Sequence, residues 1–84
     1  MENKKILKKQ IIYRSMHRGT KEMDLLLGNF VKVYIDKFDS QELHDLDNLL
    51  NLEDEVIYNW YFENSSKNII PISKVSKKLK NFKL

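Results

Sequence analysis

The sequence contains no cysteine, only one proline and only two glycines among its 84 residues. Without cysteine, the chain cannot form a disulfide framework, a thiolate nucleophile or a cysteine-ligated zinc or iron–sulfur site. It also has no apolar run near the roughly 20 residues that are needed to cross a bilayer. These absences predict a small protein that does not span a membrane and whose stability comes from packing alone.

Targeting signals are also missing from the N-terminal stretch 1–9, which is basic but is not followed by the apolar region and cleavage site of a secretory signal. A mitochondrial transit peptide would be rich in Arg and Ser and would precede the domain, whereas here a helical pattern begins almost at once. We therefore expect a cytoplasmic location in a bacterium.

The net charge of +3 hides three blocks of opposite sign. Residues 1–21 carry seven Lys or Arg and one Glu, residues 22–66 carry two Lys and eleven acids, and residues 67–84 carry six Lys and no acid. Such blocks can form a surface for a charged partner, or they can attract one another within the fold. The sequence leaves both explanations open.

Apolar residues recur at intervals of three and four along the chain, which predicts helices and no strands. The clearest stripe runs from Met23 through Leu26, Leu27, Phe30, Val31 and Tyr34. Helices are expected over about Lys4–His17, from Met23 onward, from near Ser40 behind a cap at Asp39, over about Asp54–Glu63, and after a capping Ser73. The predicted fold class is all-α, a compact bundle of about five short helices that forms one domain over residues 1–84.

The predicted buried faces differ in strength along the chain. The first helix offers Leu7, Ile11, Ile12 and Met16, and the fourth offers Val56, Ile57, Trp60 and Tyr61. The last helix has a sparse stripe among lysines, made of Ile72, Val75, Leu79 and Phe82. This stripe does not predict firm docking, so the basic segment 65–84 is free to be mobile or to be ordered by a partner.

Signatures of enzyme chemistry are sparse. His17 and His44 are the only histidines, and they fall on different predicted helices without a metal-ligand motif. There is no phosphate-binding glycine loop and no recognisable Ser/His/Asp arrangement, and the acidic run 53–55 fits the first turn of a helix. We therefore predict no catalytic residue, no metal and no stably bound cofactor.

The junction around Gly19 is the strongest candidate for a functional site. A glycine between two helical patterns is typical of a helix C-cap that takes the left-handed conformation. Charged and polar side chains gather around it, which predicts a partner-binding surface made of Arg14, His17, Arg18, Gly19, Glu22 and Asp24.

An alternative function is nucleic-acid binding. The basic residues of block 1–21 could neutralise phosphates, as in a small basic helical regulator that binds nucleic acid. The acidic middle block weakens this hypothesis, and no set of polar side chains suited to reading base edges stands out after Gly19.

The run from Arg18 to Asp24 resembles the Arg-Gly-x-x-Glu signature of the SdhE family, the small assembly factors for succinate dehydrogenase. The resemblance continues through Leu25–Leu27 and Phe30 to the run Val56-Ile57-Tyr58-Asn59-Trp60, which looks like that family's apolar-Asn-Trp segment. It covers roughly Ile11 to Phe62 and departs from the family at Thr20 and Met23, where other apolar residues are usual.

This resemblance implies a five-helix protein that binds the flavoprotein subunit of succinate dehydrogenase and promotes covalent attachment of FAD to it. The flavoprotein of fumarate reductase is a second candidate client. The protein would be a helper and not the catalyst, and would not bind FAD stably itself. Arg18 and Glu22 would contact the client, and Gly19 would allow its close approach.

Overall fold

The computed structural model describes residues 4–63 and 70–83, and over these ranges it contains helices and no strand. The helices are α1 (Lys4–Met16), α2 (Lys21–Tyr34), α3 (Ser40–Leu50), α4 (Asp54–Phe62) and α5 (Lys74–Asn81). The predictions of an all-α fold and of about five short helices are therefore confirmed.

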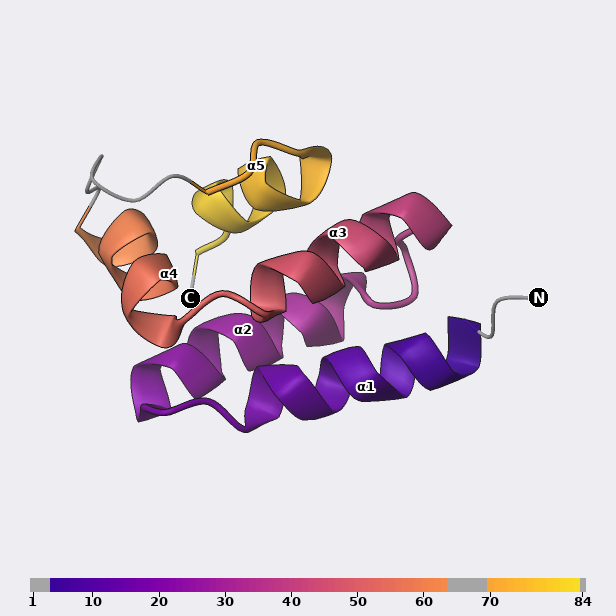
Figure 1. The fold of residues 1–84 in the computed structure, drawn as a ribbon, viewed down its shortest axis with the longest axis horizontal. Coiled ribbons are helices and arrows are strands. Elements are labelled where there is room, and N and C mark those ends of the chain that lie inside the picture. The colour runs from indigo at the N-terminus through magenta and orange to yellow at the C-terminus, as the bar shows by residue number, and fades with distance from the viewer. Residues whose placement is uncertain (1–3, 64–69, 84) are drawn as a thin grey trace.

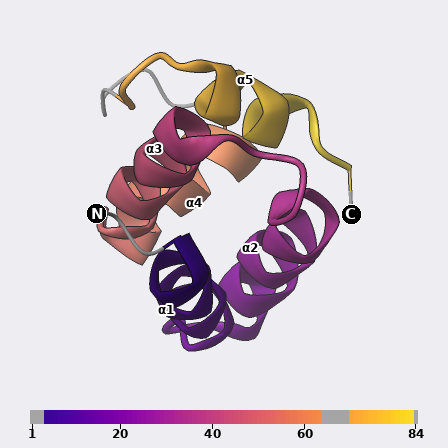
Figure 2. The same cartoon turned by 90° about the vertical axis from the view of Figure 1, so that its right-hand side faces the viewer.

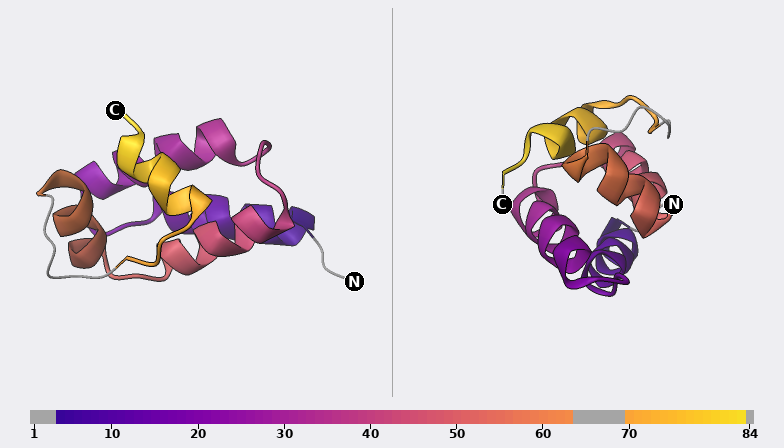
Figure 3. Two further views of the ribbon diagram at one scale, coloured as in Figure 1. Left: turned by 90° about the horizontal axis from the view of Figure 1, so that it is seen from above. Right: turned by 90° about the vertical axis from the view of Figure 1, so that its left-hand side faces the viewer.

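The helices are arranged around one interior (Figure 2), and their buried apolar side chains form one core cluster. The first three helices run alternately along the long axis of the molecule, and α1 contacts both α2 and α3 (Figure 1). Helix α4 lies at the end of the molecule where α1 turns into α2, and α5 crosses over α3 towards α2 (Figures 1 and 3). This arrangement brings the turn after α1 close to the connection between α3 and α4.

Helix α2 contributes the largest share of the core, as its strong stripe predicted. Five of its side chains are buried, and they pack with buried residues from every other helix. Among the described residues, the fully buried apolar side chains are Ile11, Met23, Leu26, Leu27, Phe30, Val31, Leu43, Leu46, Ile57, Val75 and Leu79. Burial of this apolar surface is the main favourable contribution to folding.

Helix starts are closed by side-chain caps at the predicted positions. Asp39 accepts a hydrogen bond from the Glu42 backbone N–H at 2.8 Å, and Glu42 accepts one from the Asp39 N–H at 3.1 Å, which makes a capping box. Ser73 and Ser76 form the same reciprocal pair at the start of α5. These bonds satisfy N–H groups that have no partner inside a helix.

The buried face of α1 differs from the predicted one. Ile11 and Ser15 are buried, whereas Ile12 is 40% exposed and Met16 is 56% exposed. Residues four apart lie on the same side of a helix, so the side that carries Ile11 and Ser15 faces the core and Ile12 and Met16 turn away from it. Ser15 is tolerated there because its hydroxyl donates to the Ile12 carbonyl at 2.8 Å.

Helices α4 and α5 hold each other through polar and aromatic contacts. The Tyr61 hydroxyl donates to the Phe82 carbonyl, and the Lys80 ammonium donates to the Trp60 carbonyl and lies over the Trp60 ring. Of the predicted α4 face, Ile57 is fully buried and the other members are only half-buried.

The predicted stripe of the last helix is confirmed for Val75 and Leu79, which are fully buried, and the Phe82 ring packs edge-on against Phe30. It is wrong for Ile72, which is 84% exposed because it precedes the first residue of the helix, Lys74. Residues 64–69 lie outside the described residues, and the mobility of segment 65–84 stays a prediction.

Replacing Gly28 by Ala should stabilise the fold by about 0.5–1 kcal/mol, because glycine inside a helix is less favourable than alanine. A Cβ there would meet Met16 Cγ and the Ser15 carbonyl at 3.8 Å, an ordinary van der Waals contact. Urea unfolding followed by circular dichroism measures the change. A loss of stability would show that α1 and α2 lie closer together than this distance indicates.

Candidate functional site

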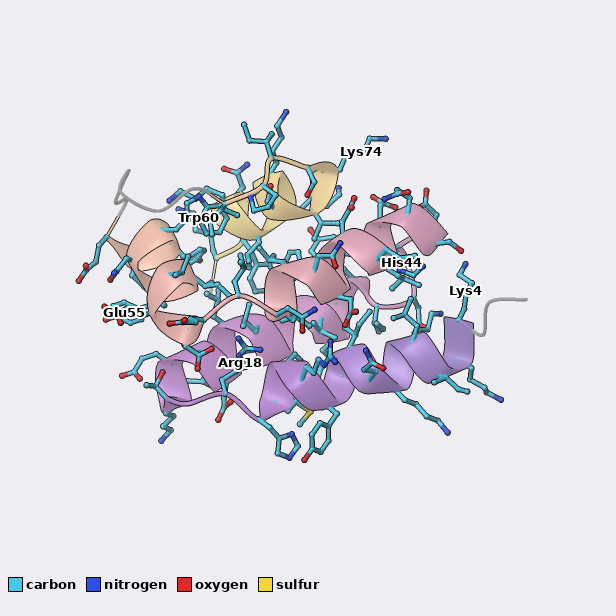
Figure 4. The ribbon with its side chains drawn as sticks, in the orientation of Figure 1. Lys4, Arg18, His44, Glu55, Trp60 and Lys74 are labelled. Atoms are coloured by element: carbon cyan, nitrogen blue, oxygen red, sulfur yellow. The ribbon has the colours of Figure 1, made fainter. Side chains whose placement is uncertain are left out.

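Arg18 lies between the turn after α1 and the connection from α3 to α4 (Figure 4). Its guanidinium contacts Asp54 Oδ1 at 2.7 Å and donates to the backbone carbonyls of Leu50 at 2.8 Å and Leu52 at 3.1 Å. Only 9% of its side chain is exposed. Buried charges need a partner of opposite sign and satisfied hydrogen bonds, and Arg18 has both. Its side chain is therefore an internal brace and not an open binding group.

Gly19 contacts the same carboxylate. Its backbone N–H donates to Asp54 Oδ2 at 2.6 Å. A Cβ at Gly19 would lie 3.1 Å from that oxygen, which is closer than ordinary contact. The backbone of Gly19 is not in the left-handed region, so the predicted left-handed C-cap is wrong. Glycine is required here by the close approach of Asp54 and not by a positive φ.

Asp24 and Thr20 fix the other side of the turn. Asp24 Oδ1 accepts a hydrogen bond from the Arg18 backbone N–H at 2.7 Å. The Thr20 hydroxyl accepts from the Met23 N–H at 3.3 Å and caps the start of α2. Both backbone N–H groups of the pair Arg18–Gly19 are thus bound by carboxylates, one from α2 and one from α4. The turn is held from two sides.

The side chains of Arg14 and His17 lie outside this network, although the Arg14 backbone carbonyl accepts a hydrogen bond from Arg18 Nη1 at 3.3 Å. Arg14 Nη1 donates to Asp47 Oδ1 at 2.8 Å and to Asn51 Oδ1 at 3.0 Å, so its guanidinium ties α1 to α3. The exposed His17 ring stacks on Tyr13 with centroids 3.9 Å apart, and its Nδ1 donates to the Tyr13 carbonyl at 2.7 Å. The six predicted site residues therefore share one end of the molecule but do not form a single cluster.

Glu22 is the predicted site residue that remains open to a partner. It is exposed, and within the part of the chain that the structure describes its side chain makes no hydrogen bond or ion pair. It borders an open hollow of about 380 Å³ between the starts of α2 and α4, lined by Thr20, Glu22, Met23, Asp54, Glu55 and Tyr58. Met23 and Tyr58 give this hollow an apolar part beside acidic side chains, which suits a protein partner better than a small ligand.

Asp54 is the important residue that the sequence did not single out. The acidic run 53–55 was interpreted only as the first turn of a helix, and Asp54 does lie there, with Glu53 as the N-cap. A buried arginine needs a carboxylate as its partner. From the sequence alone the three adjacent acids 53–55 are equal candidates for that partner, and only the fold places Asp54 beside Arg18. In Figure 4, Glu55 of the same turn points away from Arg18.

Within residues 4–63 and 70–83, no three histidine or carboxylate side chains lie close enough to hold a metal ion. None of the helices in these ranges combines the length and the apolar character that crossing a bilayer requires.

A protein-family model described as "Flavinator of succinate dehydrogenase" matches residues 9–83 of the chain. Among curated proteins, succinate dehydrogenase assembly factor 2, mitochondrial, of Schizosaccharomyces japonicus is 41% identical over 59 residues, which is 70% of this chain and 41% of the relative. FAD assembly factor SdhE of Acetobacter pasteurianus is 36% identical over 55 residues, 66% of this chain and 50% of the relative.

Succinate dehydrogenase assembly factor 2, mitochondrial, of Saccharomyces cerevisiae is 39% identical over 77 residues, 87% of this chain and 48% of the relative. The chain thus spans about half the length, or less, of these curated relatives. The match to residues 9–83 includes all of the predicted site residues.

Asp54→Ala should lower the free energy of unfolding by about 2–3 kcal/mol, because it leaves the buried Arg18 guanidinium without its counter-ion and removes the acceptor of the Gly19 N–H. Glu55→Ala is the matched control, since Glu55 is exposed and lies in the same first turn of α4. The control should stay within about 0.5 kcal/mol of the parent protein. Equal effects of the two substitutions in urea unfolding would contradict the bracing role of Asp54.

Gly19→Ala should cost about 1 kcal/mol, because the new Cβ presses on an Asp54 carboxylate that Arg18 prevents from moving away. In the Asp54→Ala background the opposing atom is gone and the same substitution should cost less. A double-mutant cycle of unfolding free energies measures this coupling. Strict additivity of the two effects would show that Gly19 is required for another reason.

Proposed function

Because the chain belongs to the family described as the flavinator of succinate dehydrogenase, we propose that it is an assembly factor that binds the flavoprotein subunit of succinate dehydrogenase and promotes covalent attachment of FAD. The observation that carries this proposal is the match over residues 9–83, which contains the whole braced turn and its open neighbour Glu22. Its relatives are titled as assembly factors for succinate dehydrogenase or for FAD.

The proposed role is that of a helper and not a catalyst. The histidine that joins the flavin, and the flavin itself, belong to the client, so this chain needs no catalytic set and no stably bound FAD. It acts by holding the client in a conformation in which that histidine and the flavin are aligned. Correct orientation of two reacting groups can remove a large part of a reaction barrier.

Arg18 and Glu22 take different parts in this proposal. Glu22 is exposed beside the hollow between α2 and α4, so we assign to it a direct polar contact with the client. The Arg18 guanidinium binds Asp54 and two backbone carbonyls inside the protein, so we assign to Arg18 the role of positioning the turn that precedes Glu22. Gly19 has no side chain, so the turn can lie close to the Asp54 carboxylate and no side chain at this position stands in the way of the client.

Nucleic-acid binding is not favoured by any feature of the fold or by the relatives. Three of the basic side chains that could neutralise phosphates form ion pairs with acids of the middle block, namely Lys8 with Asp36, Arg14 with Asp47 and Arg18 with Asp54. They are therefore engaged within the protein. These contacts agree with the explanation that charge blocks of opposite sign attract one another within the fold.

Two finer parts of the proposal concern client range and location. The flavoprotein of fumarate reductase is proposed as a second client, to be tested in the same assay. The cytoplasm of a bacterium is the proposed location, supported by the bacterial relative from Acetobacter pasteurianus, whereas the yeast relatives are titled mitochondrial. Cell fractionation followed by immunoblotting decides between these compartments.

Cells that lack this protein should show less covalent flavin in the succinate dehydrogenase flavoprotein, measured as in-gel fluorescence of the denatured subunit. The parent chain should restore the signal. Glu22→Ala should restore it several-fold less well, because truncating an interface residue that carries binding energy costs about 1 kcal/mol or more. Glu63→Ala, which removes an exposed glutamate at the end of α4, is the control and should restore it fully.

Fluorescence that does not depend on the protein would overturn the proposed function for this client. Restoration by Glu22→Ala equal to that by the control, at equal amounts of protein, would overturn only the contact assigned to Glu22.

A further inference from the structure

One side of the α1–α2 pair exposes several large apolar side chains. On α1, Tyr13 is 63% and Met16 56% exposed, and on α2 Leu25 is 50% exposed. Ile12, which is 40% exposed, continues this surface along α1. Scattered exposed apolar residues are normal, but a contiguous group is typical of an interaction site. We call the group Ile12, Tyr13, Met16 and Leu25 the α1–α2 face.

The α1–α2 face is hollowed and not flat. Two adjoining hollows of about 170 and 300 Å³ share Met16, Gly28 and Lys32 among their lining residues. Leu25 borders the first hollow and Ile12 the second. Gly28 lacks a side chain at the point where both hollows meet. Protruding apolar side chains of a partner could therefore insert between the two helices.

Two acids line the hollows, Asp24 and Asp36, and both are engaged within the protein, by the Arg18 backbone N–H and by the Lys8 ammonium, while basic side chains lie at the edges of the face. Helix α1 contains five basic residues and no acid. Lys8 and Arg14 are paired with Asp36 and Asp47, whereas Lys9 on α1 and Lys32 on α2 are exposed and make no ion pair among the described residues. Lys9 lies three residues from Ile12 and seven from Met16, and so on the same side of α1. The apolar centre thus has lysines at its edges.

The face is continuous with the candidate functional site. Glu22, Leu25, Asn29 and Lys32 follow the spacing of three and four residues that places side chains along one side of a helix. A partner that contacts Glu22 at the start of α2 can therefore extend along α2 over Leu25 and onto Met16 of α1. The two surfaces can be covered by one molecule.

Resting on the proposed function, we propose that the α1–α2 face is a second part of the client interface. It binds a segment of the flavoprotein subunit that presents apolar side chains to the two hollows and carboxylates to Lys9 and Lys32. A second copy of this chain is a poorer occupant, because both copies would bring the same lysines, and no matching carboxylate for them, into one shared interface.

The test is binding of the purified flavoprotein subunit to the purified chain, measured by isothermal titration calorimetry. The double variant Met16→Glu/Leu25→Glu places two acids on the face and should weaken binding at least about tenfold, since apolar anchors at an interface centre dominate affinity. Ile72→Glu is the control for an acid placed at an exposed apolar position, because Ile72 is 84% exposed and lies outside the face, and it should bind like the parent chain. Circular dichroism verifies that each variant keeps its helices.

A charge test uses side chains whose replacement leaves the core untouched. Lys9→Glu/Lys32→Glu should weaken binding several-fold, and this difference from the parent should shrink at high salt. Lys74→Glu/Lys77→Glu, at two exposed positions of α5, makes the same change in net charge and should have a smaller effect.

The outcomes separate the two proposals. If the parent chain does not bind the flavoprotein, the proposed function fails and this inference fails with it. If the parent chain binds and Met16→Glu/Leu25→Glu binds equally well, the inference is overturned and the proposed function stands. If light scattering shows that the parent chain is a dimer and the double variant a monomer, the face joins two copies, and the client interface lies elsewhere.

Discussion

The contact between Arg18 and Asp54 is the interaction on which the arrangement of the helix ends depends. Arg18 follows α1, Asp54 begins α4, and the Arg18 guanidinium also binds the carbonyls of Leu50 and Leu52 at the end of α3. The Leu50 carbonyl, in the last turn of α3, has no partner within the helix, and the Arg18 guanidinium donates both to it and to the Leu52 carbonyl in the connection to α4. The second oxygen of Asp54 binds the Gly19 N–H before α2. One charge pair thus connects the ends of four helices.

The basic first block and the acidic middle block of the sequence form ion pairs with each other in this fold. The ion pairs between the basic first block and the acidic middle block join α1 to the end of α2, to α3 and to α4. Exposed pairs of this kind contribute little, so Lys8–Asp36 matters less to stability than the buried Arg18–Asp54 pair. Lys9 and Lys32 make no such pair among the described residues, and their charges stay at the surface.

The sequence predicted those features that local rules control. The stripe on α2, the Asp39 cap and the Ser73 cap depend on residues within one helix, and all three were predictable. The reason for Gly19 was not, because it depends on a carboxylate 35 residues away that no local pattern distinguishes from its neighbours. The exposed side of α1 could not be predicted either, since Ile11, Ile12 and Met16 are all apolar and only packing decides which of them is buried.

Synthesis from the N-terminus limits when these contacts can form. Arg18 is made 36 residues before its counter-ion Asp54, and the carbonyls that it binds also come late. Until the start of α4 has emerged from the ribosome, α1 and α2 have no carboxylate from α4 to hold their turn. A nascent chain can therefore form the α1–α2 hairpin early, but it presents the finished surface to another protein only after most of its length has been translated. Recognition is thereby coupled to near-completion of the fold.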